Sequence, residues 1–248
     1  MRKTISFVVP AILLAMAVYA SGDVWKTKPY TQWDEKDVAA VLQSSPWAKL
    51  DVSLPGTQGE AAPNYNPGVS GPGSMPNRMG SASSATPIPQ VGTGDNPAPQ
   101  TSSRTYNLFW YSSRTIREAF ARRAVLKGTM TPGNAAKMVA GNPDSYEVLV
   151  NATDMSAFEG RAEDTFKDEA FLELKKEKKK INLTNVVFQR SSGKVVGVLF
   201  NFPKKDAEGQ PSISADEKEV GFNMRVSGAW LRASFNLKQM ADSQGPDL

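Results

Sequence analysis

Hydrophobic and polar side chains alternate most regularly in the last third of the chain, which predicts a β-hairpin over 220–235. Two runs alternate with a period of two, and Ser227-Gly228 between them suits a two-residue turn. On the other face of this hairpin, Arg225 opposes Trp230 and Asn223 opposes Arg232. The predicted pairs on the hydrophobic face are Val226 with Ala229, Met224 with Leu231, Phe222 with Ala233 and Val220 with Phe235.

A second hairpin is predicted just before this one, around the turn Ser191-Ser192-Gly193. A three-residue turn places its glycine in the left-handed conformation. In that register Phe188 opposes Val196 and Val186 opposes Val198, so the hydrophobic faces coincide.

The middle of the chain predicts strands and helices in turn. Residues 106–112 are apolar on both faces, as in a central strand, and 146–151 alternate. Between them, caps and glycine stops delimit two helices, from Ser113 to Gly128 and from Thr131 to Gly141.

A third helix is predicted after 146–151, ending in a cluster of lysines at 175–180. Cations at a helix C-terminus complement its dipole, so a solvated helix end explains the cluster, and contact with an anionic lipid or polymer is the alternative. The inner side of this helix is expected to carry Phe166, Ala170, Phe171 and Leu174.

Residues 23–54 predict a Trp-rich arm built on one short amphipathic helix. Thr31 and Asp34 have the spacing of a capping box, and the helix is expected to end before Pro46. Such a short helix is marginal alone in water, so the arm must dock. Docking on its own domain and docking on a partner through Trp33 and Trp47 both remain open.

A segment rich in proline and glycine separates this arm from the rest. Residues 55–103 hold nine Pro, eight Gly and three charged residues, which predicts a disordered linker. The remaining 104–240 has the usual length of one domain. We expect an α+β fold, with about six strands in a mostly antiparallel sheet and helices on one face, plus the tethered arm.

Residues 1–20 read as a bacterial export signal. Arg2 and Lys3 precede an apolar run from Ile5 to Val18, and Ala20 lies at a plausible cleavage point. The run is shorter than the roughly 20 residues that a bilayer span needs. We therefore expect cleavage, a periplasmic or extracellular location and no transmembrane segment in the mature chain.

The composition removes whole classes of chemistry, because the chain contains no histidine and no cysteine. Catalytic triads, thiol redox chemistry, disulfides and thiolate or imidazole metal sites all need one of these residues. No catalytic, metal or cofactor motif is recognisable. Without Arg2 and Lys3, 27 basic and 25 acidic side chains remain, which does not argue for nucleic acid as a partner.

Two groups of residues are candidate binding sites. Ser112, Ser113, Arg114 and Arg117 lie where a strand meets the N-terminus of a helix, a position that favours anions, although caps and solvent-facing arginines explain the same pattern. Trp230 with its flanking guanidinium groups suits a sugar ring or an aromatic group, although such pairs also stabilise sheets. With the arm, the surface candidates are Trp33, Trp47, Arg225, Trp230 and Arg232.

The two ends of the mature chain resemble a family of exported bacterial proteins of unknown function. The resemblance rests on the opening 25–33, on Asp37-Val38, on Ser45-Pro46-Trp47 and on the closing 235–240. It implies export and a shared fold and assigns no catalytic residue. The family often has Trp-Glu-Ser after its first domain strand, where this chain has Trp110-Tyr111-Ser112.

Together these features predict an exported, non-enzymatic binding or envelope-associated protein whose ligand the sequence does not name, with an envelope protein or polymer as the candidate partner. The alternative is a metal-independent hydrolase that uses Asp and Glu carboxylates. Two facing carboxylates in a deep pocket would favour the hydrolase.

Overall fold

The computed structural model describes residues 23–54 and 104–248. The predicted export signal and the predicted linker, 55–103, lie outside the described residues.

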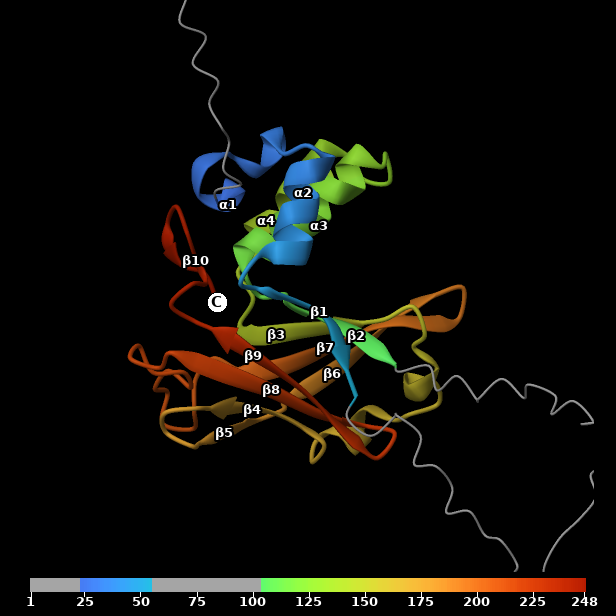
Figure 1. Cartoon of the computed structure of the whole chain (residues 1–248), viewed down its shortest axis with the longest axis vertical. Coiled ribbons are helices and arrows are strands. Elements are labelled where there is room, and N and C mark those ends of the chain that lie inside the picture. The colour runs from blue at the N-terminus through green and yellow to red at the C-terminus, as the bar shows by residue number, and fades with distance from the viewer. Residues whose placement is uncertain (1–22, 55–103) are drawn as a thin grey trace, which may run out of the picture.

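The described chain forms three layers, with helices over a five-stranded sheet and a four-stranded sheet beneath it (Figure 1). All neighbouring strands are antiparallel. The five-stranded sheet has the order β1 (Ala48–Ser53), β2 (Thr105–Trp110), β3 (Ser145–Asn151), β7 (Lys194–Pro203) and β6 (Asn185–Ser191). The four-stranded sheet has the order β5 (Lys180–Asn182), β4 (Ala170–Leu174), β8 (Glu219–Val226) and β9 (Ala229–Asn236).

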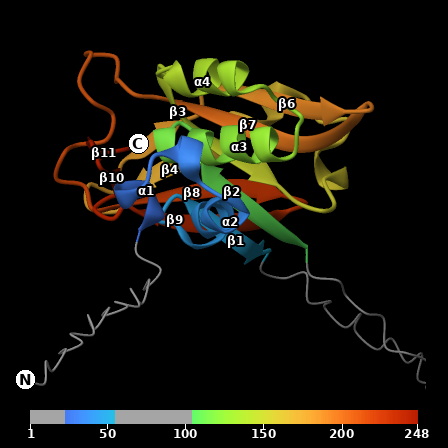
Figure 2. The same ribbon diagram turned by 90° about the horizontal axis from the view of Figure 1, so that it is seen from above.

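Helices lie on one face of the five-stranded sheet, as the view from above in Figure 2 shows. The longer ones are α2 (Glu35–Ser44), α3 (Arg114–Leu126) and α4 (Pro132–Ala140). The short elements are α1 (Val24–Thr27), η1 (Tyr30–Gln32), η2 (Ser156–Phe158), η3 (Glu163–Phe166), β10 (Ala241–Asp242) and β11 (Gly245–Pro246). None of the described helices is long and apolar enough to cross a bilayer.

The predicted α+β class is confirmed. The six strands expected from the sequence are β2, β3, β6, β7, β8 and β9, and all are antiparallel. They are divided between two sheets, with β2, β3, β6 and β7 in one and β8 and β9 in the other. The sequence pattern did not predict β1, which extends the first sheet, or β4 and β5, which extend the second.

The third predicted helix is wrong. Ala170, Leu172 and Leu174 face inward while Phe171 and Glu173 do not, so the period is two and the segment forms β4. Phe166 lies in η3 before the strand. The lysine cluster consequently occupies the turn from β4 into β5 rather than a helix end, and Lys178 in this turn has a φ of 58°.

The predicted register of the final hairpin is confirmed pair for pair. Ser227 and Gly228 both have positive φ, 48° and 85°, as a type I′ turn requires. The hydrophobic face of β8 is fully buried, whereas Arg225 is exposed.

The register of the preceding hairpin differs from the prediction. Phe188 pairs with Val198, and a bulge follows at Gln189 and Arg190. The extra residue changes which valine faces the core: Val195 is 4% exposed and Val196 is 46% exposed. The turn contains two residues, Ser192 and Gly193, both with positive φ.

Both helices predicted between the strands form with the expected caps. The Ser113 hydroxyl accepts a hydrogen bond from the N–H of Ile116, and Gly128 follows the end of α3 with a φ of 69°. The Thr131 hydroxyl caps α4, and Pro132 is its first residue.

The N-terminal segment 23–54 shares one hydrophobic core with 104–248. Its helix α2 begins three residues later than predicted, because Asp34 and not Thr31 is the N-cap, in a capping box with Asp37. The segment also provides β1, which pairs with β2. Docking therefore occurs on the same chain.

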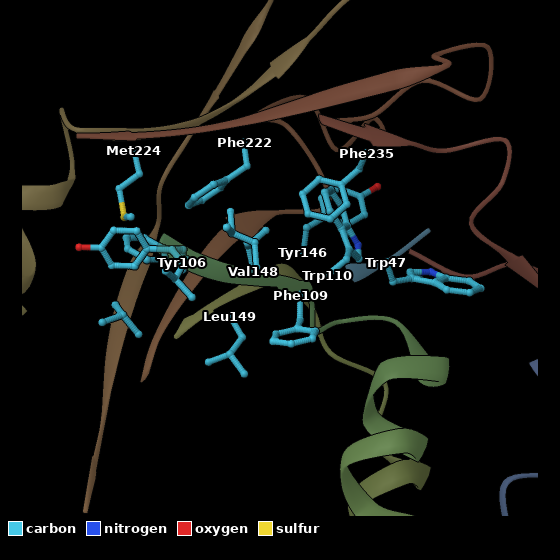
Figure 3. Packing of buried hydrophobic residues seen from close by; sticks show 14 of the residues in the cluster. Trp47, Tyr106, Phe109, Trp110, Tyr146, Val148, Leu149, Phe222, Met224 and Phe235 are labelled. Carbon is cyan, nitrogen blue, oxygen red and sulfur yellow. The ribbon is translucent and has the colours of Figure 1, made fainter. Parts of the chain in front are cut away.

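Aromatic side chains from the two sheets meet in the main core (Figure 3). The ring centroids of Trp110 and Phe235 are 5.2 Å apart, and those of Phe200 and Phe222 are 5.5 Å apart. On the other side of the five-stranded sheet, Phe109 contacts Phe120 of α3 at 5.3 Å. The inner face of the four-stranded sheet is thereby used for packing, which leaves its outer face for other contacts.

Candidate functional site

The outer face of the four-stranded sheet carries a cluster of aromatic, basic and amide side chains. We call it the outer face and define it by the residues that alternate with the buried positions of its strands. In Figure 1 it is the underside of β4, β5, β8 and β9, and no described helix lies beneath it. Its members are Phe171, Glu173, Lys180, Gly221, Asn223, Arg225, Trp230, Arg232 and Ser234.

The register places an aromatic pair at the centre of this face. Phe171 opposes Asn223, and Asn223 opposes Arg232, while Trp230 opposes Arg225 in the next row. The rings of Phe171 and Trp230 are in edge contact at 5.7 Å. Both rings stay partly exposed, and Asn223 in the strand between them is buried. The Lys180 ammonium lies 4.2 Å from the centre of the Phe171 ring, within cation–π range.

Beside this pair the outer face contains a hollow of about 400 Å³. Gly221 lines it, and a β-carbon added there would lie 3.2 Å from Cε and Nζ of Lys175. The end of the Lys175 side chain therefore occupies the space that a side chain at 221 would fill. The hollow is lined by Phe171, Glu173, Lys175, Lys180, Gly221, Asn223, Arg232, Ala233 and Ser234.

The acids of this region have partners, whereas several cations do not. Glu173 forms an ion pair with Lys175 at 2.9 Å, and the hydrogen bond from Lys175 lowers the pKa of Glu173. Glu219 accepts a hydrogen bond from the Ser234 hydroxyl. Within the described residues the guanidinium groups of Arg225 and Arg232 form no ion pair or hydrogen bond. The outer face thus carries uncompensated positive charge next to exposed aromatic surface.

This combination suits a polar ligand with a flat ring or an anionic group. Aromatic side chains offer a stacking surface, guanidinium groups bind carboxylates or phosphates with paired N–H donors, and Asn223 supplies both a donor and an acceptor. The described residues contain no cluster of acids that could hold a metal ion.

Three members of this face, Arg225, Trp230 and Arg232, were candidates from the sequence, and the structure brings them together. Phe171, Lys180 and Gly221 were missed. The signal for Phe171 was present as the alternation Ala-Phe-Leu-Glu-Leu over 170–174, which the helical interpretation obscured.

The other surface candidates, Trp33 and Trp47, lie in the core and present no surface. Both are 0% exposed. The indole N–H of Trp33 donates to the carbonyl of Lys28 at 2.9 Å, and that of Trp47 donates to the carbonyl of Asp247 at 2.6 Å. The tryptophans are buried because the N-terminal segment is part of the fold.

The predicted anion site at the start of α3 contains an anion from the chain itself. The Asp247 carboxylate accepts hydrogen bonds from the N–H groups of Arg114 and Thr115, at 2.7 and 2.9 Å, and from the Thr115 hydroxyl at 2.8 Å. Ser113 caps the helix. The backbone donors that would attract an external anion are thereby occupied.

The arginines of this region are also engaged. The Arg114 guanidinium binds the Asp242 carboxylate, and Arg117 donates to the carbonyls of Val139 and Gly141 near the end of α4. The Ser112 hydroxyl is buried and has no hydrogen-bond partner among the described residues. Arg114 and Arg117 therefore connect α3 to the C-terminal segment and to α4.

One carboxyl group in α3 has a strongly shifted pKa. Burial raises the pKa of Glu118 to about 7, with Arg114 acting against the shift and Asp247 and Asp242 adding to it. Glu118 and Asp242 line one hollow of about 340 Å³ with Arg114 and residues of α1 and η1. A carboxyl group with this pKa is suited to proton transfer near neutral pH.

The chain matches no family model, no curated protein and no solved structure. The resemblance of its two ends to a family of exported bacterial proteins therefore stays a prediction.

Proposed function

We propose that the protein is an exported, non-enzymatic binding protein that attaches to a component of the bacterial envelope through its outer face. The observation that carries the proposal is the unpaired Arg225 and Arg232 beside the partly exposed Phe171–Trp230 pair. Exposed aromatic surface beside arginines without partners is typical of recognition sites, because binding surfaces are enriched in aromatic residues and arginine.

Export is supported by the sequence alone. The charged start, the apolar run and Ala20 have the order of a secretory signal, and the lack of cysteine fits a bacterial envelope protein better than a secreted eukaryotic domain. An envelope location limits the partners to envelope proteins and polymers.

A metal-independent hydrolase is the second candidate, favoured by Glu118 with its pKa near 7. Such an enzyme needs a second carboxylate free to act on the substrate. The neighbouring Asp242 is bound by the Arg114 guanidinium, and Asp247 caps α3. The binding function is therefore the better supported of the two.

The test is co-sedimentation of the purified mature protein with bacterial envelope fragments. We expect the wild type to sediment with the fragments and Trp230→Ala or Arg232→Gln to lose at least about tenfold in affinity, since aromatic and arginine contacts dominate binding surfaces. Lys36→Gln is the charge control, because Lys36 is exposed on α2, away from this face.

Two results would overturn the proposal. One is equal sedimentation of the wild type, Trp230→Ala and Arg232→Gln. The other is loss of binding in Lys36→Gln to the same degree, which would indicate attraction by net charge alone.

A further inference from the structure

We propose that the hollow on the outer face holds one acidic sugar unit of an anionic polysaccharide. The inference rests on the proposed function and names the ligand of that same face. Its starting point is that the hollow combines an aromatic wall, a glycine floor covered by the end of Lys175, and cations without counter-ions.

The shape of the hollow suits a ring rather than a point charge. Phe171 lines one side, and Gly221 lets the end of Lys175 lie across the floor, since a β-carbon at 221 would be only 3.2 Å from Cε and Nζ of Lys175. Glycine within a strand marks a place where a ligand or another backbone approaches closely. The apolar face of a sugar can therefore lie against Phe171 while its edge reaches the floor.

Donors and acceptors surround this space. The buried Asn223 amide donates a long hydrogen bond, 3.4 Å, to the carbonyl of Gly221 and also interacts with the Glu173 carboxylate, and its oxygen remains as an acceptor for a ligand. Glu173 supplies carboxylate oxygens, and Ser234 supplies a hydroxyl. Adjacent hydroxyl groups of a sugar act as donor and acceptor at once, which matches this mixture of groups.

The charges select an acidic sugar over a neutral one. Lys180 and Arg232 line the hollow, and neither forms an ion pair among the described residues. A carboxylate on the sugar would compensate this charge, and Arg232 can bind it with two parallel N–H groups.

The neighbouring row extends the site beyond one unit. Trp230 and Arg225 lie directly opposite each other on β9 and β8, next to the row that contains Arg232. A second aromatic ring with its own unpaired guanidinium repeats the chemistry of the hollow at the next position. This repetition favours a polymer over a single sugar.

The lysine turn makes an anionic membrane the main competing partner. Three of its lysines are already paired: Lys175 with Glu173, Lys176 with Asp216 and Lys179 with Asp206. A lipid surface would require several free cations on an exposed turn, and among the described residues only Lys178 remains without an ion pair there, whereas the unpaired guanidinium groups of Arg225 and Arg232 lie on the sheet beside the aromatic rings. The distribution of free charge favours the polysaccharide.

The experiment measures binding of the mature protein to three probes: a polyuronate, a neutral glucan of similar length and vesicles containing anionic phospholipid. We expect the polyuronate to bind at least about tenfold more tightly than the glucan, with salt weakening the interaction. Equal affinity for polyuronate and glucan, or binding to vesicles alone, would overturn the inference.

Gly221→Val separates a built site from simple charge attraction. It places a branched side chain where the end of Lys175 lies and so reshapes the floor while the net charge is unchanged, and we expect at least a tenfold loss of polyuronate affinity with an unchanged melting temperature. If the valine disturbs folding, Gly221→Ala adds a single carbon whose nearest neighbour is the flexible end of Lys175. Unchanged polyuronate binding in a folded Gly221 variant would overturn the inference.

Two further variants distinguish a wrong choice of ligand from a wrong proposed function. Arg232→Gln should lower both the affinity and its salt dependence, and Lys36→Gln should change neither. If envelope binding depends on Trp230 while the polyuronate does not bind, the proposed function stands and only the choice of ligand is wrong.

Discussion

At the residue scale, Asp247 connects three parts of the fold. Its carboxylate completes the N-terminus of α3, its carbonyl accepts from Trp47, and its N–H donates to the carbonyl of Met240. One residue thereby connects the C-terminal segment, the central helix and the N-terminal segment.

Asp247→Ala should lower the free energy of unfolding by about 2–3 kcal/mol, because it leaves two helix N–H groups and the Thr115 hydroxyl without their charged acceptor. Asp247→Asn keeps an oxygen acceptor and should cost less. Urea unfolding measures both, with the exposed Asp168→Ala as the control. A loss no larger than that of the control would contradict the role of Asp247.

Glu118 makes stability depend on pH near neutrality. Burial raises its pKa from an ordinary 4.5 to about 7, so between these values the unfolded chain loses a proton that the folded protein keeps. The stabilisation is complete below pH 4.5 and is lost as the pH rises through 7. Burial also raises the pKa of Glu147, which acts in the same direction.

We therefore expect the free energy of unfolding to fall between pH 5 and 7 by at most about 2 kcal/mol from Glu118. Glu118→Gln has no proton to lose and should flatten this slope, so that the variant gains on the wild type as the pH rises. Urea unfolding at several pH values tests this. An identical slope in both proteins would show that Glu118 is not buried as a neutral acid.

At the element scale, the hairpins separate what local sequence specifies from what it leaves open. The Ser227-Gly228 turn sets its register alone, because both residues adopt positive φ and the flanking alternation is uninterrupted. In the β6–β7 hairpin, a bulge adds one residue, and the side-chain pattern beyond it reverses. Val195, Val196 and Val198 are all hydrophobic, so the sequence offers more than one consistent register.

Val195→Ala and Val196→Ala form a matched pair that tests the bulge. Val195 is 4% exposed and should lose about 1–2.5 kcal/mol on truncation, whereas Val196 is 46% exposed and should lose less than about 0.5 kcal/mol. Thermal or urea unfolding of the two variants gives the comparison. A larger loss of stability in Val196→Ala than in Val195→Ala would instead support the register predicted from the sequence, in which Val196 opposes Phe188.

At the scale of the whole molecule, the N-terminal segment is part of the sheet and of the core. β1 pairs with β2, and Trp33, Val41 and Trp47 are fully buried. Arg122 of α3 also donates to the carbonyl of Trp33 at 2.6 Å. The segment therefore stabilises the domain that follows it 49 residues later in the chain.

Deleting 23–54 should lower the melting temperature and promote self-association, because it exposes the edge of β2 and the apolar surface beneath the tryptophans. Light scattering and thermal unfolding of the shortened protein provide the measurement. An unchanged melting temperature in a monomeric product would show that the segment is dispensable for the fold.

The candidate site shows why part of the molecule was not predictable. Arg225, Trp230 and Arg232 were placed on one face from a hairpin register that depends only on neighbouring residues. Phe171 joins them through the pairing of β4 with β8, across about 50 residues of chain, and Lys180 joins through the pairing of β5 with β4. No local pattern reports that pairing.

Local chemistry thus predicted the α+β class, the caps of α3 and α4 and the final hairpin, because capping, glycine turns and two-residue alternation act within a few positions. The alternation over 170–174 was present in the sequence, but only the pairing with β8 distinguished a strand from a helix there. Long-range contacts alone decided that Trp33 and Trp47 are buried and that Asp247 completes α3. The physical reason is that a short hydrophobic segment gains most of its stability from the surface it meets, and the fold supplies that surface.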